Sequence, residues 1–366
     1  MRFPEFTDEW KESVLSDFVE RVKRKNKNNL CKLPLTISAQ YGLVDQISFF
    51  NKVIASENMS NYYLLHKGDF AYNKSYSSEY PWGAIKRLDC YEQGTLSSLY
   101  ICFKPYSHVS SDFLTHYFET SKWHQGISEI AVEGARNHGL LNVGIQDFFE
   151  TRHCLPQSLL EQEKIAKFLN LIEERIATQN KIIEKLQSLI KGLAVALTTK
   201  EKANIAISQC LECHSSTLQE SEVLSSGLCK VFGANGLVGY TDVPQMNGDA
   251  ILVIKDGSGV GTVSYAQGKF SVIGTLNYLT VIGNNDLRYL YFALSVFNFQ
   301  PYKTGMAIPH IYFKDYGKAK IYCPSLAEQK RVANVLDKLE SKLFVEQELL
   351  ASFNQQKLYL LGKMFI

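Results

Sequence analysis

The chain has 366 residues, 45% of them hydrophobic, which is ordinary for a globular protein of two or three domains. Its 39 basic and 37 acidic residues leave a formal net charge of +2, too small for a nonspecific polyelectrolyte binder. The sequence has no apolar run near the roughly 20 residues that cross a bilayer, and no hydrophobic signal core at its start. We therefore expect a cytoplasmic protein with no membrane partner, whose eight cysteines are mostly small buried hydrophobic residues.

Residues 1–154 are predicted to form a first globular module. Short apolar segments between glycine turns indicate strands, which are expected at residues 71–74, 83–87 and 99–103. A helix is expected at residues 111–121, and a loop at residues 133–139 ends the module. The basic run Arg21-Val-Lys-Arg-Lys-Asn-Lys27 fits a solvated surface segment and a phosphate contact equally well.

A long helix is predicted within residues 155–203. Pro156 blocks continuation of the helix backwards, and Ser158-x-x-Glu161 matches a capping box. In that motif the Ser hydroxyl accepts the N–H three residues on, and the Glu carboxylate reaches back to the Ser N–H. Apolar residues then recur at steps of three and four, which is typical of a coiled-coil seam. The seam positions of this helix are Ile172, Ile176, Ile183, Leu186 and Ile190.

Residues 204–323 are predicted to form a second module, which a polar linker at residues 198–227 joins to the first helix. Its expected strands are residues 250–255, 261–265, 269–273 and 278–282, followed by a helix at 286–297 and a loop at 304–310. In the linker, Cys210-Leu-Glu-Cys213-His214 lacks the second ligand pair of a zinc finger, so no metal site is expected. Gly257-Ser-Gly259-Val-Gly261 lies between two predicted strands, so a turn is favoured over a phosphate-binding loop.

A second long helix is predicted within residues 324–366. Its start repeats the first one, with Pro324 and Ser325-x-x-Glu328 at an offset of 167 residues from Ser158. Its seam positions include Leu339, Leu343, Leu350 and Phe353. Each seam carries one polar residue at the equivalent place, Gln179 and Glu346. Because a helix of some 40 residues is rarely stable alone, the two helices are predicted to pair as an antiparallel coiled coil.

The two modules also correspond to each other. Gly68-Asp69 matches Gly248-Asp249, and Gly94-Thr95-Leu96 matches Gly274-Thr275-Leu276, both at an offset of 180. The sequence therefore predicts an internal repeat with a pseudo-two-fold axis. The expected fold class is α/β (α+β), with two modules built on twisted β-sheets and separated by the long helices.

In the order of these features the chain resembles the specificity (S) subunit of Type I restriction–modification systems. The resemblance rests on the two Pro–Ser-x-x-Glu-Gln helix starts, on Phe3-Pro4-Glu-Phe6 with Trp10, and on Gly305-Met-Ala-Ile-Pro-His310-Ile311. It covers essentially the whole chain, although the second module lacks a clear counterpart of Trp10.

This resemblance implies that residues 1–154 and 204–323 are target-recognition domains, each reading one half of a bipartite site in double-stranded DNA. It implies that residues 155–203 and 324–366 are spacer helices that dock methyltransferase (M) subunits, expected to be two, with restriction/translocase (R) subunits as further partners. The chain itself is then not an enzyme and holds no cofactor. S-adenosylmethionine, ATP and Mg²⁺ are expected in the partner subunits.

Base readout needs side-chain donors and acceptors on loops that reach a groove of the duplex. The candidates in the first module are Asn73, Lys74, Ser75, Tyr76, Ser77, Tyr80, Arg136, Asn137 and His138. Those in the second module are Asn235, Tyr240, Lys255, Ser258, Lys303, Thr304 and His310. Lys255 and Arg136 are preferred, because a cation beside a glycine-rich turn can approach a guanine or a phosphate closely.

Two other functions stay open. The chain could be a protein–protein scaffold whose coiled coil is the working element and whose modules bind peptides or proteins. An enzyme with an unrecognised site is disfavoured, because the sequence has no Walker A loop, no Asn-Pro-Pro-aromatic motif and no His-Glu-x-x-His spacing. No catalytic residues are therefore predicted.

Overall fold

The computed structural model describes residues 1–77, 79–131 and 140–365, and it divides the chain into two compact units. Unit 1 consists of Met1–Thr178 with Leu350–Ile366, and unit 2 of Gln179–Leu349. The predicted boundaries at residues 154, 203 and 323 stay a prediction. In the described parts of the chain, none of the helices is both long and apolar enough to span a membrane.

Unit 1 is built mainly from short strands. These are β1 (Lys11–Val14), β2 (Val19–Arg21), β3 (Leu35–Ser38), β4 (Gly42–Asp45), β5 (Tyr63–His66), β6 (Phe70–Asn73), β7 (Ala84–Arg87), β8 (Gln93–Leu96), β9 (Ile101–Pro105) and β10 (Arg152–Leu155). Its helices are α1 (Gln46–Phe50), α2 (Ser111–Tyr117), α3 (His124–Ile130), α4 (Ile145–Phe149), the first part of α5 (Leu159–Thr198) and the last part of α9 (Leu326–Met364).

The central sheet of unit 1 is antiparallel, with the strand order β2-β9-β6-β7. Its apolar face, which includes Tyr72 of β6 and Phe103 of β9, shares a core with α2 and with Phe148 of α4. The same core includes Ile165 of α5 and Leu360 of α9, so the module and the adjoining helix ends share one hydrophobic core. Burial of this shared apolar surface is what holds the helix ends to the module.

Unit 2 contains a second set of strands and short helices. The strands are β11 (Ile205–Ala206), β12 (Leu211–Ser215), β13 (Cys229–Gly233), β14 (Gly236–Thr241), β15 (Met246–Asn247), β16 (Ala250–Ile254), β17 (Val263–Ala266), β18 (Lys269–Val272), β19 (Leu276–Val281) and β20 (Lys320–Ile321). The helices are α6 (Ile207–Cys210), α7 (Leu287–Ser295), α8 (Phe313–Tyr316) and the remaining parts of α5 and α9.

Two four-stranded sheets form unit 2, with the orders β12-β19-β16-β17 and β14-β13-β18-β15. Strand β16 is buried on both faces, which explains its unbroken apolar sequence Ala-Ile-Leu-Val-Ile. Ile251 and Val253 pack in the core that contains α7 and α9, whereas Leu252 and Ile254 pack against the second sheet. Alternate residues of one strand therefore join the two layers of the unit.

The predicted linker at residues 198–227 is wrong over much of its length. Helix α5 ends at Thr198, and β11, α6 and β12 then follow as parts of unit 2. Strand β12 pairs with β19 along its whole length, and Cys210 is fully buried in the core. The prediction failed because the strand is polar on its outer face, so its composition resembles that of a loop.

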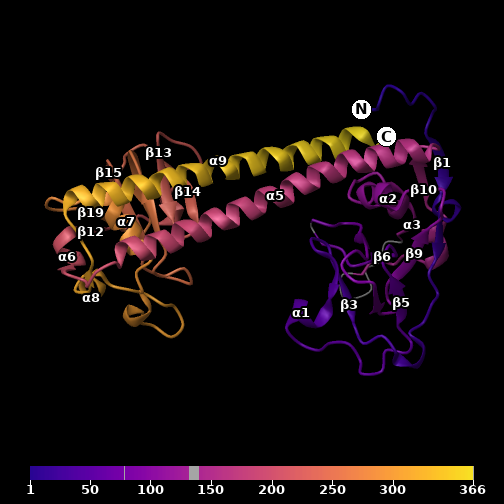
Figure 1. Ribbon diagram of the computed structural model, residues 1–366, viewed down its shortest axis with the longest axis horizontal. Helices are drawn as coiled ribbons and strands as arrows, with labels where there is room; N and C mark the ends of the chain where they lie inside the picture. The colour runs from indigo at the N-terminus through magenta and orange to yellow at the C-terminus, as the bar shows by residue number, and fades with distance from the viewer. Residues whose placement is uncertain (78, 132–139, 366) are drawn as a thin grey trace. The chain divides into compact units, whose positions relative to one another are not determined.

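The two long helices run antiparallel within each unit (Figure 1). In unit 2 the Gln179 amide donates to the backbone carbonyl of Glu346 at 3.0 Å and to its carboxylate at 2.6 Å. In unit 1 Lys357 pairs with Glu173 at 2.7 Å. Ile172 and Ile183 are buried, and the other predicted seam positions are half-buried. The antiparallel coiled coil and the α/β fold are therefore confirmed.

A buried glutamine ties each helix start to its module in the same way. In unit 1 the Oε1 of Gln162 accepts the N–H of Ser110, the N-cap of α2, at 2.8 Å, and its Nε2 donates to the carbonyl of Pro156 at 2.9 Å. In unit 2 Gln329 makes the equivalent bonds to Asp286, the N-cap of α7, and to Pro324, both at 2.8 Å. These paired contacts support the internal repeat independently of the sequence match.

Only half of the predicted capping box forms. The N–H groups of Glu161 and Glu328 lie 3.4 Å from the hydroxyls of Ser158 and Ser325. The Glu161 carboxylate instead accepts two hydrogen bonds from Arg2, at 2.6 and 2.8 Å, and one from Trp10 at 3.1 Å, while Glu328 pairs with Arg331. A buried carboxylate needs strong donors, which the N-terminal segment supplies in unit 1.

Candidate nucleic-acid interface

In unit 2 the candidate residues gather where the central strand β16 ends. The carbonyl of Lys255, the residue after the strand, accepts the N–H of Ile311 at 2.9 Å. Asp256 forms an antiparallel bridge with His310, and the N–H of Gly257 donates to the carbonyl of Pro309 at 2.9 Å. These backbone bonds place Lys255 beside the loop that precedes Ile311.

That loop, residues 304–310, is closed at its base by hydrogen bonds. Thr304 and His310 exchange two backbone hydrogen bonds, at 2.9 and 2.8 Å. Gly305 has a φ of +87°, and a Cβ there would lie 2.3 Å from the carbonyl oxygen of Ile308. Only glycine therefore fits this position without displacing the loop.

The turn between β16 and β17 has no helix behind it, as the sequence predicted. Gly257 has a φ of +100°, and Gly261, with a φ of +87°, packs against the ring of Phe299. The turn presents Ser258 at the surface. A strand-to-strand turn lacks the aligned N–H groups of a helix N-terminus, so it is not a phosphate-binding loop of the nucleotide type.

Unit 1 makes the same contact at the same place in its sheet. Lys74 follows strand β6 as Lys255 follows β16, and the Lys74 carbonyl accepts the N–H of Leu141 at 2.9 Å. Ser75 forms a bridge with Leu140, as Asp256 does with His310. The repeat therefore extends to the backbone geometry of the candidate loops.

The loop after β6 is held by local hydrogen bonds. The side chain of Asn73 accepts the N–H of Ser75 at 3.0 Å, and Ser77 and Tyr80 exchange backbone bonds at 3.1 and 3.2 Å. Burial, with the charges of Glu119 and Glu79, raises the pKa of the Tyr80 hydroxyl, so this group remains a hydrogen-bond donor at neutral pH.

The structure brings some of the predicted residues together and separates others. Asn73, Lys74, Ser75, Tyr76, Ser77 and Tyr80 lie in one loop region of unit 1, and Lys255, Ser258, Lys303, Thr304 and His310 lie in one loop cluster of unit 2. Asn235 and Tyr240 belong to the β13–β14 hairpin of the second sheet instead. Arg136, Asn137 and His138 lie outside the described residues. The role of each residue in DNA contact stays a prediction.

Sequence reasoning missed three residues of the unit 2 cluster. Asp256 lies next to Lys255, with 3.9 Å between its carboxylate and the ammonium group. Met306 and Ile308 form the exposed tip of the 304–310 loop. The candidates were chosen as side-chain donors and acceptors, so apolar residues of the predicted loop were not among them.

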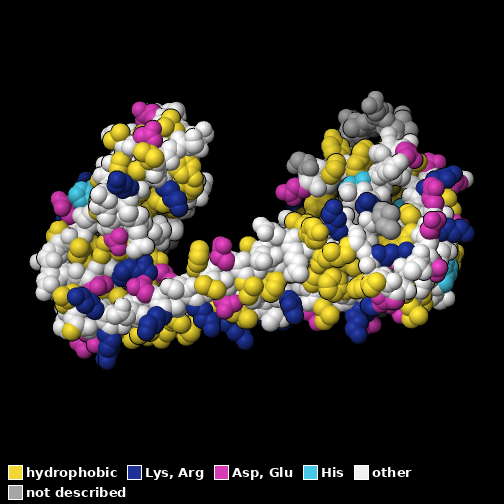
Figure 2. All heavy atoms as spheres, turned by 90° about the horizontal axis from the view of Figure 1, so that it is seen from above, with side chains coloured by type: hydrophobic (Ala, Val, Ile, Leu, Met, Phe, Trp, Pro, Cys, Tyr) yellow, Lys and Arg dark blue, Asp and Glu magenta, His cyan; other side chains and the backbone are white. Residues whose placement is uncertain are grey.

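The surface charge agrees with the small net charge of the chain. Figure 2 shows Lys and Arg side chains interspersed with Asp and Glu side chains on the visible face of each unit. Binding to an acidic polymer would therefore depend on local groups of cations rather than on the overall field.

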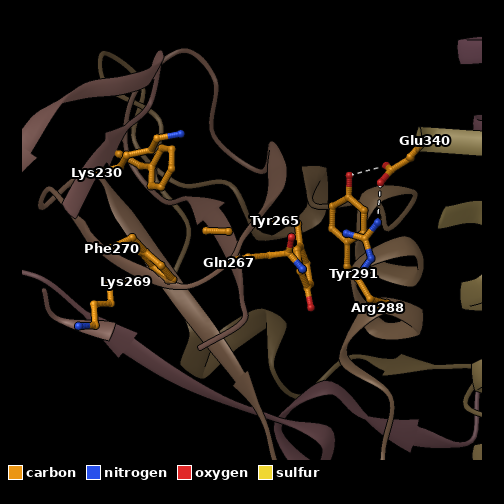
Figure 3. A pocket seen from close by; sticks show the side chains of 10 residues that line it. Lys230, Tyr265, Gln267, Lys269, Phe270, Arg288, Tyr291 and Glu340 are labelled. Atoms are coloured by element: carbon orange, nitrogen blue, oxygen red, sulfur yellow. Dashed lines mark hydrogen bonds and ion pairs between the residues drawn. The ribbon is translucent and has the colours of Figure 1, made fainter. Parts of the chain in front are cut away.

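A second group of polar side chains in unit 2 lines a cavity of about 370 Å³ (Figure 3). Arg288 lies 4.3 Å from the centre of the Tyr265 ring and donates to Asp337 and to Glu340, at 2.6 and 2.7 Å. The Tyr291 hydroxyl donates to Glu340 at 2.9 Å, and burial raises the pKa of this hydroxyl. These ion pairs connect α7 to α9, so the cluster orients the helix on its module.

The comparisons with known proteins agree with this organisation. Residues 214–355 match the family described as the Type I restriction modification DNA specificity domain. The specificity subunit of the Type I restriction enzyme EcoprrI of Escherichia coli is 24% identical over 110 residues, which are 30% of this chain and 27% of that protein. This match thus spans about a quarter of the length of that relative.

Two solved structures share the fold over nearly the whole chain. The Type I restriction-modification S subunit from M. genitalium has a TM-score of 0.63 at 16% identity, covering 100% of this chain and 99% of that one. A structure described as the basis of complex assembly and conformational transition of the Type I R-M system has a TM-score of 0.58 at 16% identity, covering 98% and 97%. The resemblance to Type I specificity subunits is therefore confirmed.

Proposed function

We propose that this chain is a non-catalytic DNA-recognition subunit, which reads a bipartite target and directs methyltransferase and restriction subunits to it. One observation carries the proposal, a backbone hydrogen bond that the two modules share. In each module the carbonyl of the lysine after the central strand accepts an N–H from a segment later in the chain, that of Leu141 for Lys74 and that of Ile311 for Lys255. The backbone frame is repeated, whereas the side chains on it differ. Two different readers on one repeated frame suit a target whose two halves differ in sequence.

Chemistry is assigned to the partners in this proposal. Methyl transfer would occur in M subunits that hold S-adenosylmethionine, and cleavage and translocation would occur in R subunits that use ATP and Mg²⁺. This chain would provide the contacts that select the site. The long helices α5 and α9 offer exposed apolar side chains to a protein partner, among them Leu171, Leu189, Phe344, Val345 and Leu358.

The test is co-expression of the chain with its M subunits, followed by methylation profiling of the host DNA. A recognition subunit yields one split methylated sequence, and replacing residues 1–154 with those of a homologue changes one half of that sequence only. A protein–protein scaffold, the second candidate, would change its bound partner and leave the methylated sequence unaltered. Methylation without sequence preference in the assembled complex would refute the proposal.

A further inference from the structure

The tip of the 304–310 loop exposes two large apolar side chains. The side chain of Met306 is fully exposed, and Ile308 is 65% exposed, whereas Ile311, three residues further on, is 1% exposed. Of the large apolar side chains of this segment, Ile311 therefore joins the core, and Met306 and Ile308 lie at the surface. Single exposed apolar residues are common, but two of them on the tip of one closed loop call for an explanation.

Backbone hydrogen bonds fix the base of this loop and thereby the place of its tip. Its base is closed by the paired Thr304–His310 bonds and attached to the end of β16 by the Asp256–His310 bridge. The Nδ1 atom of His310 lies 3.1 Å from the carbonyl oxygen of Ile308. This distance fits a hydrogen bond from a protonated Nδ1 to the carbonyl, across the tip of the loop.

The residues beside the apolar tip are polar or charged. Lys303 and Thr304 precede it and His310 follows it. The backbone carbonyl of Lys255 accepts the N–H of Ile311 next to the loop, and the Lys255 ammonium group lies 3.9 Å from the carboxylate of Asp256. Two side chains offer much less area than the roughly 800 Å² that each partner buries in a stable protein–protein interface. Lys255 and Lys303 outweigh Asp256, so the net charge of the residues beside the tip is positive and complements the phosphates of a duplex.

Within the major groove, the 5-methyl group of thymine is the apolar feature that a protein can read. On the basis of the function proposed above, we infer that Met306 and Ile308 contact a thymine methyl group in the half-site of unit 2. The lysines beside the tip would then hold phosphates, and the loop tip would distinguish a thymine from the other bases at one position. Burying one methyl group predicts about a fourfold difference in affinity.

Deoxyuridine tests this contact, because it pairs as thymine does and lacks only the methyl group. The chain is assembled with its M subunits, and the half-site of unit 2 is identified as the half that the exchange of residues 1–154 leaves unchanged. Each thymine of that half-site, on either strand, is replaced in turn by deoxyuridine, and the affinity of the duplex is measured. We expect one replacement to weaken binding about fourfold.

The double variant Met306→Ala with Ile308→Ala should bind the thymine and deoxyuridine duplexes equally. Val243→Ala is the matched control, because Val243 is 80% exposed in the same unit but lies after β14, outside the loop. This control should keep the fourfold difference.

Four results would overturn the inference. No deoxyuridine has an effect, the double variant keeps the effect, or the half-site contains no thymine on either strand. The fourth is loss of M subunits from the complex of the double variant, which would assign the tip to a protein contact. Methylation without sequence preference by the unaltered complex would refute the proposed function itself, which separates the two failures.

Discussion

Replacing Gln162 with Met removes the bonds that join α5 to the start of α2, while it keeps an unbranched side chain of similar volume. The N–H of Ser110 and the carbonyl of Pro156 then lose partners at 2.8 and 2.9 Å. A buried polar group left unpaired costs about 1–3 kcal/mol. Since Ser110 is only half-buried, we expect the free energy of unfolding of unit 1 to fall by about 2–4 kcal/mol.

Tryptophan fluorescence measures this loss selectively, because all three tryptophans, Trp10, Trp82 and Trp123, belong to unit 1. In urea, the fluorescence transition of Gln162→Met should move to a clearly lower midpoint. Gln356→Met, at an exposed position of α9 in the same unit, should stay within about 0.5 kcal/mol of the unaltered protein. Equal midpoints for the two variants would refute the assigned role of the buried glutamine.

Three further predictions concern the helices and the core of unit 1. Ile183→Asp should lower the stability of unit 2 by about 2–4 kcal/mol more than Ile182→Asp, because Ile183 is 8% exposed and Ile182 is 36% exposed. Urea unfolding followed by far-UV circular dichroism measures the difference. Equal losses of stability would exclude a seam position at Ile183. Glu161→Gln should destabilise unit 1 by about 1.5–3 kcal/mol, because its hydrogen bonds from Arg2 no longer join two opposite charges. Glu174→Gln, at an exposed position, is the control and should leave the stability unchanged. An unchanged urea midpoint of the tryptophan fluorescence for Glu161→Gln would contradict this prediction. Burial lowers the pKa of His153 to about 4, below its unfolded value of about 6.5. The unfolded chain therefore binds the proton first as the pH falls, and unit 1 should lose about 3 kcal/mol of unfolding free energy between pH 6.5 and 4. In urea unfolding followed by tryptophan fluorescence, His153→Gln should show a smaller dependence of stability on pH, and an identical dependence would rule out His153 as its source.

Local signals predicted the frame of the molecule. Pro156 and Pro324 mark the helix starts, and the steps of three and four mark the seam, because both patterns depend on residues close in sequence. The strand predicted at residues 250–255 is confirmed as β16 (Ala250–Ile254) for the same reason.

Long-range contacts explain what the sequence did not reveal. Strand β12 was missed because its pairing partner β19 lies more than sixty residues away. The role of Gln162 was missed because its partner Ser110 lies 52 residues earlier, and a polar residue near a cap is expected at the surface. The candidate loops could be located, but the exposure of Met306 depends on the closure of its loop by His310.

The composition of unit 1 from two distant chain segments has a consequence during synthesis on the ribosome. Phe365 packs against Phe113 and Trp10 in the core of unit 1, whereas unit 2 is the continuous segment Gln179–Leu349. At roughly 5–20 residues per second, about ten to thirty seconds pass between the emergence of the two segments of unit 1. During this interval the N-terminal segment of unit 1 exposes part of its apolar core, because Leu350–Ile366 has not yet been synthesised. Unit 2, which is one continuous segment, lacks no later part of the chain. Chaperone binding during translation should accordingly concentrate on the first half of the chain.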